Sequence, residues 1–219
     1  MASRFRIRIF FIGSSVAAAV AMLCLMACGS YKQFAVSQLY NKEGFSGADL
    51  GGRSITVSPL FTPRGVVADG ELTSQIEIES INKKRRTLPL LPHEVFEERY
   101  ISTSGEDALD SFYTCLFKGK MVELQAMEKP WKQIGSDYLM VLKLTYGLRI
   151  MSGKEKSARR LRLEGELWDC DSIEVLWRVA VDCRIMGEKN TDRQVLLDAI
   201  CRVFEALPPV IPGYGKGRW

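Results

Sequence analysis

The sequence predicts an α/β (α+β) fold, with a mixed sheet of about five strands in the order β-α-β-α-β-β-β-α and helices packed on the sheet. Three observations support this prediction. Segments with apolar residues at strand spacing alternate along the chain with segments at helical spacing. Residues 138–182 hold three strand-like segments in succession, which predicts a C-terminal β-meander. A segment at helical spacing over residues 191–207 follows them and closes the domain.

The length and composition indicate one globular domain with an N-terminal extension. The chain has 219 residues, of which 47% are hydrophobic and 26% are charged. These values lie near the average of folded proteins, so wholesale disorder and collagen-like repeats are excluded. The formal net charge of +4 falls to +1 when residues 1–27, with their three arginines, are removed. A basic nucleic-acid-binding protein is therefore not indicated.

Residues 1–28 have the organisation of a bacterial export signal. Arg4, Arg6 and Arg8 precede an uncharged segment over residues 9–28, and small residues stand before its final cysteine. The last four residues of this segment, Leu-Met-Ala-Cys, resemble the lipobox of bacterial lipoproteins. They place an aliphatic residue three positions before the cysteine and a small residue immediately before it.

The lipobox resemblance implies cleavage between Ala27 and Cys28, with acyl chains attached to Cys28 as the first residue of the mature chain. Several acyl chains anchor a protein durably, because each buried CH₂ group contributes about 0.8 kcal/mol. Gly29 follows the cysteine, where inner-membrane lipoproteins of enteric bacteria carry Asp. The resemblance therefore implies an anchor in the outer membrane, facing the periplasm.

Two alternatives for the N-terminus stay open. An uncharged segment of about 20 residues is long enough to span a bilayer as an uncleaved anchor, and an ordinary secreted protein would lose its signal without acylation. The predicted organisation is a lipoprotein signal peptide over residues 1–27, a lipidated cysteine with a flexible glycine-rich tether over 28–53, a single α/β domain over 54–209 and an irregular tail over 210–219.

The first half of the domain is predicted to alternate between strands and helices. β-branched residues favour strands, and apolar residues three and four positions apart favour helices. Ser104, followed by Glu106 and Asp107, resembles a helix N-cap with an acidic first turn. The expected elements are a strand over 54–58, a helix over 71–86, a strand over 94–101 and helices over 104–117 and 121–127.

The second half is predicted to form a meander and a closing helix. Residues 138–142 are apolar on both faces, which favours an interior strand. The next two segments, 160–167 and 173–182, alternate apolar and charged residues and are expected to pair antiparallel. A three-residue loop, 170–172, would place opposite each other Glu164 and Arg178, Arg160 and Asp182, and Gly165 and Trp177. A capping box beginning at Thr191 is expected to start the closing helix.

This layout resembles the periplasmic α/β domains of envelope lipoproteins. The resemblance lies in the strand Tyr-Leu-Met-Val-Leu that begins at Tyr138 and in the hairpin over residues 166–177. The curli-secretion channel lipoprotein and the N-terminal domain of the Tol–Pal β-propeller protein have domains of this kind. The resemblance covers residues 54–209 and implies a fold and an envelope role, but it carries no catalytic residues.

The sequence shows no assembled catalytic set. His93 is the only histidine; it is expected on the surface or at a strand edge, with a general base as the alternative. Ser80 and Lys83 match the Ser-x-x-Lys pattern, but its companion motifs are absent. Glu164 and Glu166 are explained as the exposed face of a strand. No metal-ligand spacing is found, so no metal or cofactor is expected and the protein is expected not to be an enzyme.

The remaining candidates are a basic run and four cysteines. The run Lys83, Lys84, Arg85 and Arg86 is expected to be a solvated helix end, with contact to an anionic lipid surface as the alternative. The cysteines that remain after processing are Cys115, Cys170, Cys183 and Cys201. The predicted hairpin separates Cys170 from Cys183 by over ~30 Å, too far for a disulfide. Cys115, Cys183 and Cys201 are expected to be buried free thiols, although a disulfide among them stays open.

These features give three hypotheses for function. The leading one is a lipid-anchored accessory or assembly protein that is held in the membrane by acyl chains on Cys28 and binds another envelope protein. A second, suggested by the fold resemblance, is a subunit of an oligomeric secretion or pore-forming assembly. A third, an envelope hydrolase, lacks a nucleophile paired with a base.

Overall fold

The computed structural model describes residues 31–62, 65–66, 78, 81, 88–150, 158–186 and 192–210. The described strands are β1 Tyr31–Asn41, β2 Ile55–Thr62, β3 Gly65–Val66, β4 Leu90–Pro92, β5 Tyr138–Ile150, β6 Ala158–Asp169 and β7 Glu174–Met186. The helices described over their whole length are α3 His93–Ser104, α4 Glu106–Lys118, α5 Met121–Ala126, α6 Glu128–Ile134 and α7 Asp192–Glu205.

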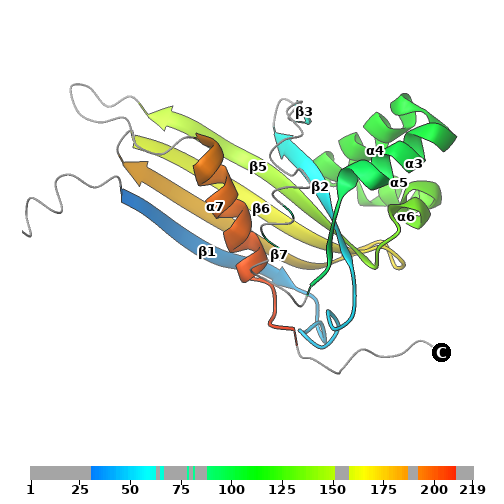
Figure 1. Cartoon of the computed structure of the whole chain (residues 1–219), viewed down its shortest axis with the longest axis horizontal. Coiled ribbons are helices and arrows are strands. Elements are labelled where there is room, and N and C mark those ends of the chain that lie inside the picture. The colour runs from blue at the N-terminus through cyan, green and yellow to red at the C-terminus, as the bar shows by residue number, and fades with distance from the viewer. Residues whose placement is uncertain are drawn as a thin grey trace, which may run out of the picture.

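The strands form one mixed sheet. Seven described strands take part, in the order β1-β7-β6-β5-β2-β3, with β4 beside β2. β2 runs parallel to β4 and β5, and the other neighbours are antiparallel. Figure 1 shows α7 lying along one face of the sheet, while α3–α6 gather at one end of the molecule. The predicted α/β class, meander and closing helix are confirmed, although the sheet has more strands than expected.

β5 is buried on both of its faces. Tyr138, Met140 and Leu142 belong to the core that contains α7, whereas Leu139 and Val141 belong to the core that contains α3, α4 and α6. Successive side chains of a strand point to opposite faces, so a segment covered on both sides is expected to have apolar residues in succession, as residues 138–142 do. The predicted interior strand is therefore confirmed.

Residues 31–53 belong to the folded domain, so the predicted flexible tether over 28–53 is wrong for this part. β1 pairs with β7 along almost its whole length. Phe45 and Leu50 are buried in the core. A β-carbon at Gly47 would lie 1.7 Å from the carbonyl oxygen of Pro209. That glycine therefore permits close packing of two backbones and does not serve to make the segment flexible.

Residues 94–101 form part of helix α3, so the predicted strand is wrong. His93, Phe96 and Tyr100 are the buried residues of α3, and their separations of three and four positions place them on one helical face. Pro92 precedes the helix in an extended conformation. A proline at a helix start loses no backbone hydrogen bond, because the first N–H groups have no partner within the helix.

The other predicted helices agree with the structure except at some ends. α4, α5 and α7 confirm the helices expected over 104–117, 121–127 and after Thr191. Ser104 ends α3 and does not cap α4; Gly105, with a φ of 84°, joins the two helices. The short helix α6 was not predicted, and its Pro130 lies in the first turn, where proline is tolerated.

Several predictions lie outside the described residues. These include Cys28, Thr191, the basic run 83–86 and all of the tail beyond Val210. The same holds for most of the helix predicted over 71–86, of which Ile78 and Ile81 are described as helical and buried.

β6 and β7 form the predicted hairpin, but their register differs from the expected one by two residues. Glu166, and not Glu164, lies opposite Arg178. The connection spans residues 170–173, one residue more than expected, and a bulge at Leu176 adds another. The observed register also places Arg160 opposite Arg184 and Gly165 opposite Val179. A shift of two residues leaves each side chain of β6 on the sheet face predicted for it, because side chains along a strand alternate between the two faces with a period of two.

Candidate functional site

β1 is the edge strand on the β7 side of the sheet. No strand among the described residues pairs with its outer side. Residues 31–38 pair regularly with β7, and a register shift follows near Leu39. An edge strand presents a row of unpaired N–H and C=O groups, to which another extended chain can add as a strand.

Three apolar side chains of β1 are exposed. Val36, Leu39 and Tyr40 expose 46%, 45% and 45% of their surface. The only charged residue of β1 is Lys32, which pairs with Asp198 of α7 at 2.8 Å. Soluble proteins commonly protect edge strands with charged side chains, so an edge with exposed apolar residues is a candidate interaction site.

A groove of about 430 Å³ adjoins the C-terminal end of β1. It is lined by Leu39, Tyr40, Lys42, Met121, Glu174, Val175 and Arg178. Lys42 and Glu174 form an ion pair in this lining. Next to Met121, Val122 of α5 exposes 78% of its surface. Apolar residues combined with Tyr, Met, Arg and a polar rim are typical of surfaces that bind other proteins.

The tip of the β6–β7 hairpin supplies one wall of this groove. The Oδ1 atom of Asp169 accepts hydrogen bonds from the backbone N–H groups of Asp171 and Ser172, each at 2.9 Å. Ile173 has a φ of 55°, which β-branched residues rarely adopt. This turn and the bulge at Leu176 set the positions of Glu174 and Val175, which line the groove.

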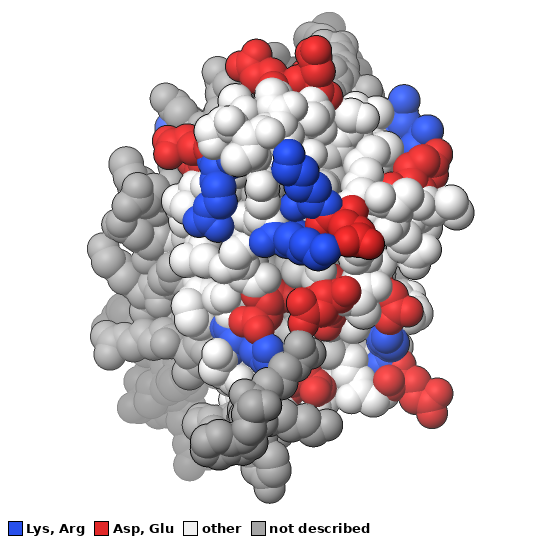
Figure 2. Space-filling model, turned by 90° about the vertical axis from the view of Figure 1, so that its right-hand side faces the viewer, with Lys and Arg blue, Asp and Glu red and all other residues white. Residues whose placement is uncertain are grey.

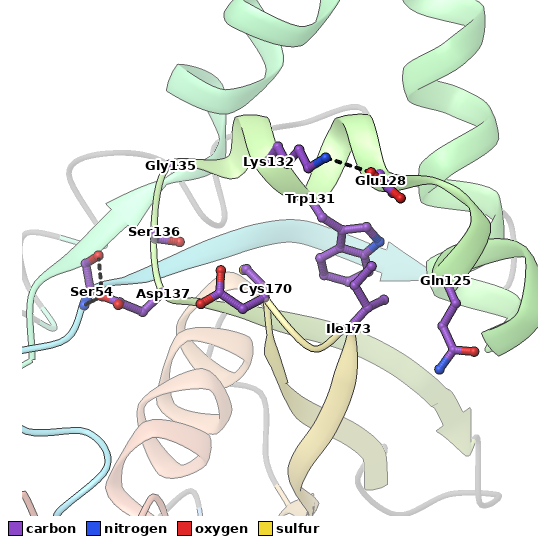
Figure 3. A pocket seen from close by; sticks show the side chains of 11 residues that line it. Ser54, Gln125, Glu128, Trp131, Lys132, Gly135, Ser136, Asp137, Cys170 and Ile173 are labelled. Atoms are coloured by element: carbon purple, nitrogen blue, oxygen red, sulfur yellow. Dashed lines mark hydrogen bonds and ion pairs between the residues drawn. The ribbon is translucent and has the colours of Figure 1, made fainter. Parts of the chain in front are cut away.

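A second hollow, of about 600 Å³, shares the hairpin tip and α5 with the groove. Figure 3 shows Asp137 directed toward Ser54, Glu128 toward Lys132, and Ile173 beside the indole ring of Trp131. The carboxylate of Asp137 accepts a hydrogen bond from the backbone N–H of Ser54 at 3.0 Å and also pairs with Arg53. The lining therefore combines fixed polar groups with one aromatic wall.

Two ionisable groups of the second hollow, Asp137 and Cys170, have pKa values that are shifted by their surroundings. Burial alone would raise the pKa of Asp137, but hydrogen bonds from Ser54 and Arg53 outweigh burial and lower that pKa. Burial raises the pKa of the Cys170 thiol well above its usual range, which disfavours the reactive thiolate. No histidine is among the described lining residues. The hydroxyl of Ser54 also donates a hydrogen bond to the Asp137 carboxylate at 3.4 Å, so the hollow can bind polar groups.

Glu166 is buried, so the prediction that it lies on an exposed strand face is wrong. Its carboxylate lies 2.8 Å from Nζ of Lys143 and 3.0 Å from Nε of Arg178. Phe61, opposite Lys143 on β2, belongs to the core that contains α3, α4 and α6. The alternating pattern of β6 correctly predicts the sheet face on which Glu166 lies. It does not reveal that the core containing α3, α4 and α6 covers one end of that sheet face.

His93 is also buried, and the prediction of a surface position is wrong. Its Nδ1 lies 3.6 Å from Oε2 of Glu94, and its Nε2 lies 4.0 Å from Oε1 of Glu97. The hydroxyl of Tyr113 donates a hydrogen bond to that Glu97 oxygen at 2.8 Å, and burial raises the pKa of Tyr113. These residues lie on α3 and α4 and line neither the groove nor the second hollow.

Of the remaining predicted residues, the structure describes the four cysteines and does not describe the others. Cys115, Cys170 and Cys183 are buried free thiols, whereas Cys201 is half-buried. Ala27, Cys28 and the basic run 83–86 lie outside the described residues. Within the described ranges, no group of three or more His, Cys, Asp or Glu residues is placed to hold a metal ion. In the same ranges, no helix has the length and apolar character needed to cross a membrane.

Comparisons with known proteins give structural similarities alone. No protein-family model matches the sequence, and no curated protein sequence matches it significantly. The PelC dodecamer from Paraburkholderia phytofirmans is 12% identical, with 82% of this chain and 100% of that chain covered and a TM-score of 0.44. Lipoprotein GNA1162 from Neisseria meningitidis is 17% identical, with 70% and 96% covered and a TM-score of 0.44. The LpoB C-terminal domain from Salmonella enterica is 12% identical, with 64% and 85% covered and a TM-score of 0.36.

At this level of similarity, the functions of these proteins cannot be inferred for this chain. The Neisseria protein is described as a lipoprotein, the class that residues 1–28 predict here. None of the three structures is the curli-secretion lipoprotein or the Tol–Pal protein, so that finer resemblance stays a prediction.

Proposed function

We propose that this chain is a lipid-anchored protein of the bacterial envelope that binds another envelope protein through β1 and the adjoining groove, without catalysis of its own. The observation that carries the proposal is that β1 begins at Tyr31, three residues after the predicted acylated Cys28. Three residues span at most about 10 Å. An anchor on Cys28 would therefore hold the start of an exposed edge strand at the membrane surface.

The direction of β1 relates the anchor to the groove. A strand of 11 residues is about 36 Å long. The groove adjoins the end of β1 that is remote from Cys28. The partner that suits this arrangement is an extended segment of another envelope protein, which adds as a strand to β1 and places an apolar side chain in the groove.

The anchor disfavours one alternative partner, a second copy of this chain. Two copies that paired antiparallel through β1 would bring their Val36 residues together at the centre of the joint sheet. Their Tyr31 residues would then lie at opposite ends of the paired strands, about 33 Å apart along the strand direction, with Cys28 three residues before each. Two anchors in one leaflet fit that geometry only if β1 lies along the membrane surface and does not stand on it, which favours a different protein as the partner.

Site-specific photo-crosslinking in intact envelopes tests the partner. A crosslinking amino acid at position 36 is expected to give one discrete adduct with a second envelope protein, whereas the same group at Val95 of α3, also exposed, is expected to give none. Leu39→Lys should reduce the adduct at least ~10-fold, since it removes an apolar contact at the edge. The matched control Ile101→Lys, at an exposed apolar position of α3, should leave it unchanged.

Two results would contradict this proposal. One is an adduct formed equally well from position 95, which would show that crosslinking does not depend on β1. The other is an adduct that contains peptides of this chain alone, which would support the hypothesis of an oligomeric assembly.

Metabolic labelling with palmitate tests the anchor separately. The wild-type chain is expected to take up the label and the Cys28→Ala variant to take up none. Label retained by Cys28→Ala would rule out acylation at the proposed residue.

A further inference from the structure

The end of the sheet at which β1 begins carries an excess of positive charge. It consists of the paired strand ends 31–33, 148–150, 158–160 and 184–186. The exposed cations described among these residues are Arg160 and Arg184, whereas Lys32 is paired with Asp198 at 2.8 Å. We call this region the basic end.

Arginines lie opposite arginines at the basic end. Arg160 is paired with Arg184 in the β6–β7 register. Like charges opposite each other in a sheet are destabilising. Two residues further along β6, Arg162 instead lies opposite Asp182, at 3.3 Å. Of these two neighbouring register positions, only the one at the basic end places like charges opposite each other.

Arg160 and Arg184 are accessible to a large partner. Both are exposed, and they line a shallow hollow of about 420 Å³ on the sheet face with Gln33 and with Asp182, whose carboxylate is paired with Arg162. An anionic partner that covered this surface would relieve the repulsion between the two guanidinium groups. The cost of pairing like charges is thus offset when such a partner binds.

The opposite end of the molecule has a different charge pattern. Figure 2 shows Lys and Arg side chains lying beside Asp and Glu side chains on that end. Its ion pairs include Lys132 with Glu128 at 2.6 Å and Lys120 with Glu123 at 3.1 Å. Charge of mixed sign does not favour an anionic partner at that end.

We infer that the basic end binds the anionic phospholipid headgroups of the membrane that holds the acyl anchor. The inference rests on the proposed function, in which Cys28 is acylated three residues before β1. Gln33 pairs with Arg184, so the arginines lie within a few residues of the anchor in the sheet. A basic patch and an acyl anchor act together as two membrane-binding signals. The domain then stands on the membrane by its basic end, with the groove directed away from the bilayer.

Vesicle sedimentation tests this contact without the acyl chains. The protein is the chain from residue 28 with Cys28→Ser, which contains every residue that the structure describes. It is expected to bind vesicles of phosphatidylcholine mixed with phosphatidylglycerol and not to bind vesicles of phosphatidylcholine alone. High salt is expected to dissociate the protein from the mixed vesicles. The Arg160→Gln/Arg184→Gln variant should bind about 20-fold more weakly, since each cation near an anionic surface contributes about fivefold.

A control variant with the same loss of net charge tests whether vesicle binding depends on where the cations lie or only on their number. Arg99→Gln/Lys118→Gln removes two exposed cations from α3 and α4 and is expected to bind within about twofold of the parent protein. Equal weakening in the two double variants would overturn the inference, as would equal binding to neutral vesicles. Displacement by inorganic phosphate at constant ionic strength would assign the arginines to free phosphate instead.

Two further measurements keep the result interpretable. Thermal unfolding of Arg160→Gln/Arg184→Gln is expected at or above the parent Tm, because the substitutions remove a like-charge pair. Sedimentation uses unacylated protein, so its failure is distinguishable from failure of palmitate labelling at Cys28.

Discussion

At the scale of single residues, the ion pair of Lys143 with Glu166 combines strong attraction with costly burial. The two side chains are 8% and 5% exposed. Loss of one partner leaves the other charge buried without compensation. Glu166→Leu is therefore expected to lower the free energy of unfolding by about 3–5 kcal/mol. Urea denaturation followed by tryptophan fluorescence measures this change.

The matched double variant separates loss of the pair from loss of packing. Lys143→Met/Glu166→Leu replaces both charges with apolar groups and is expected to recover most of the lost stability. Lys132→Met, in the exposed pair with Glu128, should cost less than ~1 kcal/mol. If the Lys143→Met/Glu166→Leu protein were as unstable as Glu166→Leu, the destabilisation could not come from an uncompensated Lys143.

Asp137 is expected to give a pH-dependent contribution to stability. Burial alone would raise its pKa, but hydrogen bonds from Ser54 and Arg53 stabilise the ionised form and lower the pKa in the folded state. A lowered folded-state pKa contributes stability that is present above the unfolded value of about 3.9 and is lost as pH falls through the folded value. Wild type is therefore expected to exceed Asp137→Asn in stability most at neutral pH.

Urea denaturation at a series of pH values checks this expectation. The difference in unfolding free energy between wild type and Asp137→Asn should shrink as the pH is lowered below about 4. A difference that stays constant through this range would show that the Asp137 carboxylate contributes no ionisation-linked stability.

At the scale of elements, the packing of α7 on β6 depends on a glycine. A β-carbon at Gly165 would lie 2.3 Å from Cγ1 of Val203 on α7. Gly165→Ala is therefore expected to lower the unfolding free energy by about 1–3 kcal/mol, since α7 or its valine has to move. Combining it with Val203→Ala should cost less than the sum of the two single changes. Strict additivity in thermal denaturation would contradict this contact.

The elements that the sequence predicts well are those in which local pattern and final burial agree. β5 and α7 have unambiguous apolar spacing and are buried accordingly. In α3, by contrast, Val95 and Ile101 are exposed while Phe96 and Tyr100 are buried. Apolar residues on both faces obscured the helical spacing of the buried pair. Only the packing of α3 against the rest of the protein determines which of these apolar residues are buried and which are exposed.

The candidate site was largely beyond prediction, because its residues meet only in the folded chain. The groove joins Tyr40 of β1, Met121 of α5 and Val175 of β7. Tyr40 fell within the predicted tether, where nearby glycines outweighed the strand-like pattern of residues 31–41. The hairpin register failed for a related reason, since neither the fourth loop residue nor the bulge at Leu176 has a clear local signal.

At the scale of the whole molecule, β1 connects the proposed anchor to the domain and also completes the sheet. Phe34 packs against the core that contains α7 and lies under the guanidinium of Arg202, 5.8 Å from its ring centroid. Lys32 pairs with Asp198, and the backbone pairs with β7. Removing β1 would break these contacts together and expose the edge of β7.

A truncation series therefore distinguishes an integral strand from a tether. A chain that begins at Gly29 is expected to unfold with the same Tm as the chain from residue 28. A chain that begins at Lys42 is expected to lose about 1 kcal/mol or more of unfolding free energy through the lost packing of half-buried Phe34, and to expose apolar surface that binds a hydrophobic dye. Scanning calorimetry of both proteins measures the difference. Equal Tm values would mean that β1 contributes nothing to the fold and that residues 31–41 serve only to link the domain to Cys28.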